Sequence, residues 1–440
     1  MEKFRVKYFN VVPAGLDGFG EEMLRTFYSR VLSSDFFQKV GETFATKVSL
    51  IAIGLVTSVI IARILGPEGR GLYGVAVAIG AIGVQFSNLG LHAANTYYVA
   101  RDRKLLPELT SNTLMVSFGF GGFITVLMWM IFYLWPNLAP VHGLLLILSL
   151  MWIPFGIAYM LLQNLLLGIQ EVRDYNKIET VTKIFGVVLI GLVISVRRVT
   201  VETVFSAGLV ALTSSFVWSL WRLLTHMTHF PMPSFALLKD NARYGLKAYL
   251  TAFFGFLVLR ADVLMVKYLL GAEQTGYYSV AASMSEMTYI LPVTVGALLF
   301  PKLSALSGLE EKKYLTKRVS KAIGAGMFFV LVITAFLAKP FVKLLYGEAF
   351  LQSVSAFLWL LPGMFFLGVE TVAVQFLNSV GFPRIVVVAW VLTCVLNISL
   401  NMWAIPKYGI AGASIVSSLS YFAVFAVVMW VSWNTRVDYE

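Results

Sequence analysis

Residues 64–76 read ILGPEGRGLYGVA, and residues 269–281 read LLGAEQTGYYSVA, 205 positions later in a chain of 440 residues. The residues Leu65, Gly66, Glu68, Gly71, Tyr73, Val75 and Ala76 recur in register as Leu270, Gly271, Glu273, Gly276, Tyr278, Val280 and Ala281. Each copy leaves one apolar segment, turns tightly and enters the next. Two equivalent halves embedded in lipid are typical of transporters that move around a site held between the halves. The repeat therefore favours transport over catalysis.

The composition places most of the chain in a membrane. Hydrophobic residues make up 58% and charged residues 13%, and the mean hydropathy is +0.80, whereas soluble domains carry about 25% charged residues. Apolar runs near the length of ~20 residues that crosses a bilayer recur along the chain. The predicted spans are 44–65, 71–99, 112–134, 142–167, 178–196, 203–225, 244–270, 276–300, 320–345, 353–380, 383–405 and 409–432. The fold class predicted is an all-α polytopic membrane protein with about twelve helices in two pseudo-symmetric six-helix lobes.

The predicted organisation has five parts, and the repeat sets the main division. They are an N-terminal extension (1–40), an N-lobe with helices 1–6 (41–230), a cytoplasmic linker (231–243), a C-lobe with helices 7–12 (244–434) and a short cytoplasmic tail (435–440). Apolar residues at helical spacing in the extension fit an interfacial amphipathic helix. A loosely ordered cytoplasmic tail fits the same residues equally well.

Orientation follows from the positive charges. Most of the 34 Lys and Arg residues lie in the extension and in alternate loops on the same side, and the richer side of a membrane protein is cytoplasmic. The chain is therefore expected in the cytoplasmic (inner) membrane as a multi-pass protein with both termini in the cytoplasm. The net charge of +11 comes mostly from these cytoplasmic Lys and Arg residues. A nucleic-acid partner is not expected, because the sequence shows no basic soluble face with exposed aromatic residues.

The residues needed for disulfides, metal binding and ATP hydrolysis are missing from the sequence. Cys394 is the only cysteine, and the four histidines show no HExxH spacing, so neither a disulfide nor a metal site is expected. No Walker A sequence is present, and transport therefore needs an ion gradient, the membrane potential or consumption of product. No cofactor and no enzymatic activity are predicted. An integral-membrane glycosyltransferase or polymerase remains an alternative, although no segment long enough for a soluble domain is seen.

The repeat and its surroundings resemble a known family. IARILGPEGRGLY (61–73) is similar to the first helical hairpin of the Wzx-type polysaccharide flippases, which share a superfamily with the MATE drug exporters and the lipid II flippase. ADVL (261–264) followed by LGAEQTGYY (270–278) resembles the same family's seventh-to-eighth helix junction, and NISLN (397–401) with YGIAGA (408–413) its eleventh-to-twelfth. The resemblance covers roughly residues 40–434.

The resemblance implies two lobes forming a V around a central cavity. It implies as cargo an oligosaccharide on a polyprenyl pyrophosphate, moved from the cytoplasmic to the outer leaflet by alternating access for cell-surface polysaccharide or O-antigen synthesis. Its implied partners are this lipid-linked substrate, membrane lipids, H⁺ or Na⁺, and polysaccharide polymerase or assembly proteins. A MATE-like ion-coupled exporter of drugs or small organic cations stays open as an alternative within the same fold.

Charged residues in or near the spans are candidates for the substrate pathway, because a pyrophosphate cannot cross hydrocarbon unpaired. Arg260 lies within the seventh span, and Asp262 follows about 200° around the helix, so the two are not expected to pair. The remaining candidates are Lys247, Lys47 and Arg63, for which reaching to the membrane surface is the competing interpretation. Asp262, Glu286 and Glu370 are candidates for ion coupling, with structural bonding as the alternative.

Polar stripes at helical spacing predict the wall of a hydrated cavity. They comprise Gln85, Asn88, His92 and Asn95 on the second span, Ser279, Ser283 and Glu286 on the eighth, Thr371, Gln375 and Asn378 on the tenth, and Cys394, Asn397 and Asn401 on the eleventh. Helix packing uses the same residue types. The GPEGRG turn, in contrast, is predicted to be structural and not a phosphate loop, because its second copy keeps the glycines and the glutamate but loses Arg70.

Overall fold

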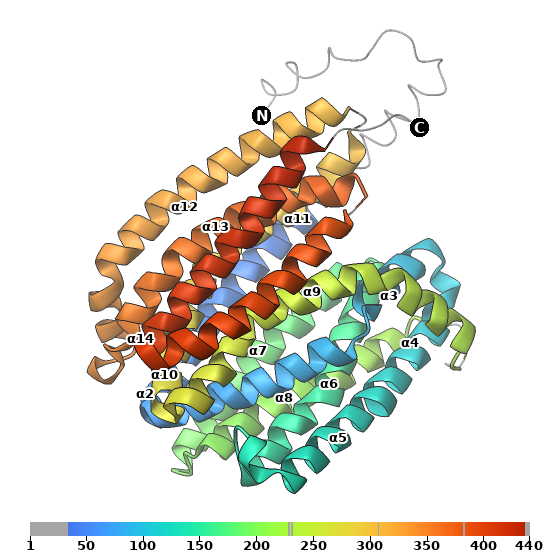
Figure 1. The fold of residues 1–440 in the computed structure, drawn as a ribbon. Coiled ribbons are helices and arrows are strands. Elements are labelled where there is room, and N and C mark those ends of the chain that lie inside the picture. The colour runs from blue at the N-terminus through green and yellow to red at the C-terminus, as the bar shows by residue number, and fades with distance from the viewer. Residues whose placement is uncertain (1–33, 228, 230–231, 307, 382, 436–440) are drawn as a thin grey trace, which may run out of the picture. The chain divides into compact units, whose positions relative to one another are not determined.

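The computed structural model describes residues 34–435 apart from 228, 230–231, 307 and 382, and every element in it is a helix or a turn (Figure 1). The α-helices of the first repeat are α2 (Ser34–Ser87), α3 (Leu91–Arg101), α4 (Leu106–Leu114), α5 (Gly121–Leu134), α6 (Gly143–Gly168), α7 (Val172–Ser195) and α8 (Val201–Leu224). Those of the second are α9 (Phe235–Leu270), α10 (Ala272–Thr288), α11 (Ile290–Ala305), α12 (Leu309–Leu345), α13 (Ser353–Ser379) and α14 (Arg384–Asn434). Short 3-10 turns are η2 (Arg103–Leu105), η4 (Pro136–Leu138) and η5 (Glu348–Phe350), and η3 (Met115–Phe120) is a π-helical turn that joins α4 to α5. The N-terminal extension (1–40) lies mostly outside the described residues.

The described residues contain nine helices long and apolar enough to cross a membrane, or ten if α10 and α11, bent by 40°, form one span. The predicted number of twelve is not confirmed by this count. Helices α2 and α14 have 54 and 51 residues, which is about 75–80 Å of helix for a membrane core of about 30 Å. Each is interrupted by a non-helical glycine, Gly66 in α2 and Gly409 in α14. These are the places where the sequence predicts one span to end and another to begin.

The repeated turn has the backbone that its sequence predicts. Gly66 has φ 66° and Gly271 has φ 89°, in the left-handed region where only glycine is unstrained. Pro67 and Ala272 follow directly as the first residues of the next helix. The chain thus reverses without a loop, and the residues after each glycine already belong to a helix.

Two predicted spans are broken. The span 71–99 ends as α2 at Ser87 and resumes as α3 at Leu91, because Leu89 and Gly90 both have positive φ. The side-chain oxygen of Asn88 accepts a hydrogen bond from the Gly90 backbone N–H at 2.8 Å and stabilises this break. The span 276–300 is likewise divided into α10 and α11 at Tyr289.

The two copies of the turn pack against each other. A methyl group added to Gly71 would overlap the carbonyl oxygen of Ala272, and one added to Gly276 would overlap the carbonyl oxygen of Pro67. The two contacts are related by the same shift of 205 positions as the sequence repeat. The glycines at 71 and 276 are therefore needed for close backbone approach, as in small-residue helix crossings in membranes, and the sequence repeat is also a contact in space.

Two further contacts join the repeats at this end of the helices. Arg63 donates hydrogen bonds to the carbonyl oxygens of Leu344 and Leu345, both at 2.6 Å, at the end of α12. Tyr268, which holds the equivalent position in the second repeat, donates to the carbonyl oxygen of Leu138. Each repeat thus binds free carbonyls at the end of a helix in the other.

The predicted linker (231–243) is largely helical. Residues 235–243 form the first turns of α9, which packs against α3 and α4 of the first repeat. The side-chain amide of Asn241 donates to Asn95 at 3.3 Å, and that of Asn112 donates to the Ser234 carbonyl at 2.9 Å. Ser234 caps the helix, its hydroxyl accepting from the Leu237 N–H. This cap stabilises the first turn of α9. The predicted domain boundaries stay predictions.

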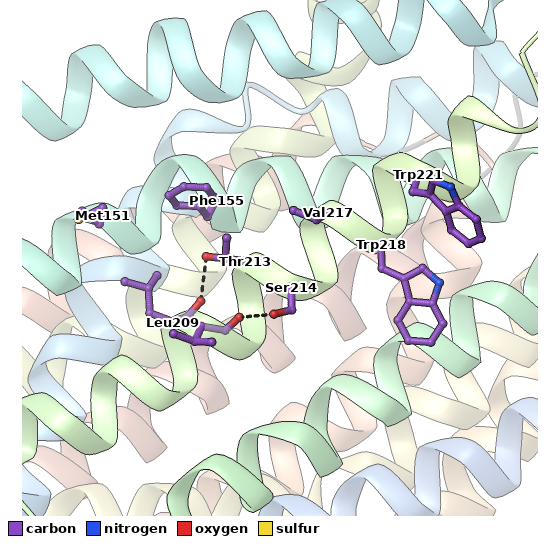
Figure 2. A pocket seen from close by; sticks show the side chains of 9 residues that line it. Met151, Phe155, Leu209, Thr213, Ser214, Val217, Trp218 and Trp221 are labelled. Atoms are coloured by element: carbon purple, nitrogen blue, oxygen red, sulfur yellow. Dashed lines mark hydrogen bonds between the residues drawn. The ribbon is translucent and has the colours of Figure 1, made fainter. Parts of the chain in front are cut away.

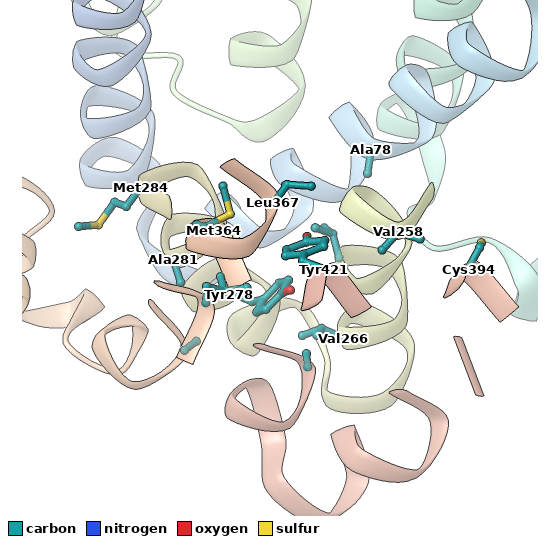
Figure 3. Close-up of a cluster of buried hydrophobic side chains, with 14 of the residues drawn as sticks. Ala78, Val258, Val266, Tyr278, Ala281, Met284, Met364, Leu367, Cys394 and Tyr421 are labelled. Atoms are coloured by element: carbon teal, nitrogen blue, oxygen red, sulfur yellow. The ribbon is translucent and has the colours of Figure 1, made fainter. Parts of the chain in front are cut away.

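The largest apolar core extends through both repeats, and much of it lies where α13 packs against α10, α11, α12 and α14. Figure 3 shows part of it: Tyr278 and Tyr421 lie among apolar side chains that include Met364 and Leu367. Both tyrosines are buried. Because a buried hydroxyl requires a partner, this core also contains polar groups, described below.

Candidate functional site: a charged cavity between the two repeats

A cavity of about 820 Å³ lies between helices of the two repeats. Helices α2, α6, α7 and α8 supply one part of its lining, and α9, α10 and α11 supply the other. Its charged, amide and Ser/Thr lining residues are Thr57, Ser58, Arg70, Gln85, Glu179, Thr182, Lys183, Arg260, Ser279, Ser283 and Glu286. A cavity with polar groups in its lining is thus present, but most of its charged residues were not among those predicted.

Arg70 is the most deeply buried charge in the cavity wall, with 7% of its surface exposed. Its Nη2 donates to the hydroxyl of Ser58 at 3.3 Å and to that of Ser283 at 3.1 Å, so both repeats hold the guanidinium. The Cζ atom of Arg70 lies 5.7 Å from the centre of the Tyr73 ring. The Nε atom has no hydrogen-bond partner, and no described acid lies within ion-pair distance of Arg70. A buried cation held by neutral groups and with a free donor is suited to receive an anion.

Arg260 and Glu286 form an ion pair beside Arg70. Arg260 Nη2 lies 2.9 Å from Glu286 Oε2, and the side chains are 31% and 35% exposed. Glu286 follows Ser283 by three residues on α10, so the pair and the Arg70 contact share one helix face. The structure places both predicted residues in the cavity wall, and it pairs Arg260 with Glu286 and not with Asp262, as the helical rotation predicts.

The first repeat adds a second pair of charges and several rings. Glu179 and Lys183 are one turn apart on α7 and both line the cavity, as do Trp152 and Tyr159 of α6. Aromatic faces and polar groups together suit a ligand that is both apolar and hydroxylated. The cavity therefore offers cations, rings and hydroxyls in one lining.

Asp262 lies outside the cavity lining, in the core of the second repeat. It is 3% exposed. One carboxylate oxygen accepts hydrogen bonds from the hydroxyls of Tyr278 and Ser417, the latter at 3.1 Å, and the other accepts from the Val263 N–H at 2.8 Å. Three donors satisfy this carboxylate, which joins α9, α10 and α14.

Of the stripe on the second span, only Gln85 lines the cavity. Asn88 stabilises the helix break, and His92 Nδ1 lies 3.2 Å from Asn88 Oδ1. Asn95 donates to Thr113 at 2.9 Å and packs α3 against α4. The stripe is divided because the break at Gly90 turns the residues after it away from the direction of α2.

The stripe on α10, Ser279, Ser283 and Glu286, lines the cavity, whereas the stripes on α13 and α14 are used within the second repeat. Gln375 donates to the Thr371 carbonyl at 3.1 Å, and Asn378 donates to Gln375 at 3.2 Å. Asn397 donates to Ser420 at 2.9 Å, and Asn401 donates to Asn397 at 3.0 Å. None of the four belongs to the cavity lining. Glu370 is also outside it, 4% exposed on α13.

The remaining predicted residues are placed as follows. Arg63 binds the end of α12 and is not in the cavity. The side chains of Lys47 and Lys247 lie outside the described part of the structure.

Sequence reasoning missed Arg70, Glu179 and Lys183. Arg70 was assigned to a loop, and that assignment is wrong, because the helix resumes immediately after Gly66. A signal was available: proline is favoured in the first turn of a helix, so Pro67 already places Arg70 inside one. Lys183 lies five residues inside the predicted span 178–196, so the predicted span already places this charge within a helix.

A separate hollow of about 710 Å³ lies on α6 and α8 and is shown in Figure 2. Its lining is apolar apart from Thr213 and Ser214, whose hydroxyls donate to carbonyls of their own helix at 2.9 and 2.8 Å. Its lining contains no charged residue, in contrast to the cavity between the repeats.

The sequence matches a family and several curated relatives. A profile of the family described as "Polysaccharide biosynthesis protein" matches residues 60–355. A Haloferax volcanii protein provisionally named low-salt glycan biosynthesis flippase Agl15 is 23% identical over 267 residues, which are 60% of this chain and 54% of that protein. A Shigella flexneri protein provisionally named O-antigen transporter is 24% identical over 184 residues, 41% of this chain and 43% of that protein. The matches thus span about half the length of these relatives.

Solved structures show the same fold. An inward-facing multidrug-resistance MATE transporter superposes with a TM-score of 0.70 at 16% identity, covering 87% of this chain and 93% of that one. The lipid II flippase MurJ in an inward closed conformation gives 0.66 at 16% identity, covering 89% and 87%. The chain therefore has the all-α, multi-pass fold of these transporters.

Proposed function

Because the chain belongs to the polysaccharide biosynthesis protein family, we propose that it flips a polyprenyl-pyrophosphate-linked oligosaccharide from the cytoplasmic to the outer leaflet of the cytoplasmic membrane. The glycan would then serve cell-surface polysaccharide synthesis. Both termini face the cytoplasm in this proposal, in line with the distribution of Lys and Arg. The matched relatives named as a glycan flippase and an O-antigen transporter support this cargo.

The observation that carries the proposal is the buried Arg70 in a cavity shared by the two repeats. An anion that crosses the membrane must exchange water for fixed positive charge, and Arg70 offers a donor that no described residue uses. Arg260 adds a second guanidinium, held by Glu286 until an anion competes for it. The rings and hydroxyls of α6 and α7 would face the sugars.

The direct test is lipid mass spectrometry on cells with and without the gene. We expect the deletion strain to accumulate complete polyprenyl-pyrophosphate oligosaccharide and to lose its surface polymer. Unchanged lipids together with altered sensitivity to cationic drugs would assign the chain to MATE-like export instead.

We expect Arg260→Gln to lower the rate of flipping. We expect Glu286→Gln to give a rate different from that of Arg260→Gln, because the two changes have opposite effects on the charge that meets the anion. Removing Arg260 deletes a cation and leaves Glu286 without its partner, facing the incoming pyrophosphate; removing Glu286 frees Arg260 to bind the anion. The double variant should therefore be less impaired than Arg260→Gln alone. Flipping of a fluorescent lipid-linked oligosaccharide in proteoliposomes measures the order of the three rates. Wild-type rates in all three variants would exclude the pair from the pathway.

Ion coupling is proposed at Asp262, whose carboxylate and neighbouring hydroxyls are oxygen ligands of the kind that hard cations prefer. Asp262→Asn keeps the shape and removes the charge, so the response of flipping to an imposed Na⁺ or proton gradient should be lost. Flipping is measured in vesicles with and without each gradient. The same response in Asp262→Asn as in the wild type would move coupling to Glu286, Glu370 or another group.

A further inference from the structure

A third hollow, of about 700 Å³, is formed by α12, α13 and α14. It shares no lining residue with the cavity between the repeats. A ligand in it therefore has no direct path to Arg70. What binds here must be argued from this hollow alone, independently of the proposed transport.

One end of the hollow is basic. Lys313, Lys317 and Lys321 follow one another at intervals of four on α12, which places them on one face of the helix. Glu310 also lines the hollow, and its Oε1 lies 3.5 Å from the Nζ of Lys313. Lys317 lies 4.8 Å from the centre of the Trp433 ring, and no described acid lies within ion-pair distance of Lys317 or Lys321. Two lysines are thus available to an anion.

The rest of the hollow is mostly apolar; the hydroxyls of Thr316 and Ser432 donate to carbonyls of their own helices, and one hydroxyl is unsatisfied. Phe365 and Phe376 of α13 and Phe425 of α14 line it. Ser320 lies between the lysines on the same face, is 7% exposed, and its Oγ has no hydrogen-bond partner in the structure. A buried polar atom without a partner is rare and costly unless something binds it.

We infer that this hollow binds an anionic glycerophospholipid of the leaflet on the lysine-rich side. Its phosphate would lie against Lys317, Lys321 and the Ser320 hydroxyl, and an acyl chain would lie on the phenylalanines. Basic pockets between transmembrane helices on the cytoplasmic side are typical anionic-lipid sites. The lysine-rich segment 302–321 is on the side assigned to the cytoplasm by the positive charges.

A substitution at Gly324 can fill the apolar part of the hollow. A methyl group there would lie in ordinary contact, 3.5 Å from Val369 and 3.9 Å from Phe365, so alanine fits whereas a phenylalanine side chain would extend into the hollow. Gly324→Phe should thus exclude the acyl chain while the lysines remain.

The experiment is native mass spectrometry of the full-length protein, stripped of lipid in detergent and titrated with phosphatidylglycerol or phosphatidylcholine. We expect the wild type to bind at least one phosphatidylglycerol about tenfold more tightly than phosphatidylcholine. The Lys317→Gln/Lys321→Gln variant should lose this preference, Ser320→Ala should reduce it, and Gly324→Phe should lose the bound lipid. The matched control is Lys302→Gln/Arg318→Gln, which removes the same charge from the same end of the helices outside the hollow.

Three results would overturn the inference. The first is an equal loss of preference in the control variant, which would indicate a general charge effect. The second is an unchanged preference in Lys317→Gln/Lys321→Gln. The third is tighter binding of undecaprenyl phosphate than of phosphatidylglycerol at this hollow, which would make it a site for the cargo's lipid. Variants whose thermal unfolding differs from the wild type are replaced by Lys317→Glu, which reverses one exposed charge.

Discussion

Replacing Arg70 with glutamine is expected to lower flipping about 10- to 100-fold, because a hydrogen bond to a charged group contributes about 1.5–3 kcal/mol. Glutamine can still donate to Ser58 or Ser283 but carries no charge. Arg70→Lys keeps the charge and loses the planar set of donors, so a smaller loss is expected. Flipping of a fluorescent lipid-linked oligosaccharide in proteoliposomes measures both variants.

A structural role for Arg70 would give a different result. In that case Arg70→Gln would lower the protein level or its unfolding temperature, and binding of a soluble prenyl pyrophosphate by the remaining folded protein would be unchanged. The control is Arg198→Gln, which removes an exposed arginine after α7. Wild-type flipping by Arg70→Gln would remove the central residue of the proposed anion site.

The second large effect is expected at the contact between the repeated turns. Gly71→Val and Gly276→Val should each abolish flipping while the protein still inserts, because any side chain at these positions overlaps backbone of the other repeat. A backbone cannot move aside as a flexible side chain can, so the two turns must separate. If transport alternates between states in which this end is closed and open, the closed state is lost.

Gly191→Val is the matched control for this pair. Gly191 lies in α7, and nothing lies within 4 Å of a methyl group built on it, so the variant adds the same side chain to a helix without a clash. Gly71→Ala should be impaired as well, since the overlap already occurs at the first carbon. Wild-type flipping rates in Gly71→Val and Gly276→Val would mean that the contact is not needed for transport.

The repeat and the apolar spans were readable from sequence because both are local properties. A glycine with positive φ at a helix boundary has the same geometry in any surroundings, and the boundaries at Gly66 and Gly409 follow from it. The breaks at Gly90 and Tyr289 were not predicted. Gly90 needs the side chain of Asn88 to stabilise it, and a continuous apolar pattern conceals the division of 276–300.

Residue periodicity identified polar faces but could not say what each face contacts. Gln85 and Asn88 belong to one predicted stripe, yet one lines the cavity and the other stabilises a helix break. Asn397 and Asn401 show equally regular spacing and serve packing within the second repeat. The period of a helix fixes which residues share a face, whereas the neighbour of that face depends on how the helices pack.

The sequence by itself determined that this chain crosses the membrane many times in two related halves. It also determined that a glycine turn joins two helices at the same place in each half. Only the tertiary structure decided that the two turns contact each other and that Arg70 joins Arg260 and Glu286 in one cavity. The physical reason is that hydropathy and turn geometry act over a few neighbouring residues. The cavity, in contrast, is formed by residues more than 200 positions apart, which meet only when the repeats pack together.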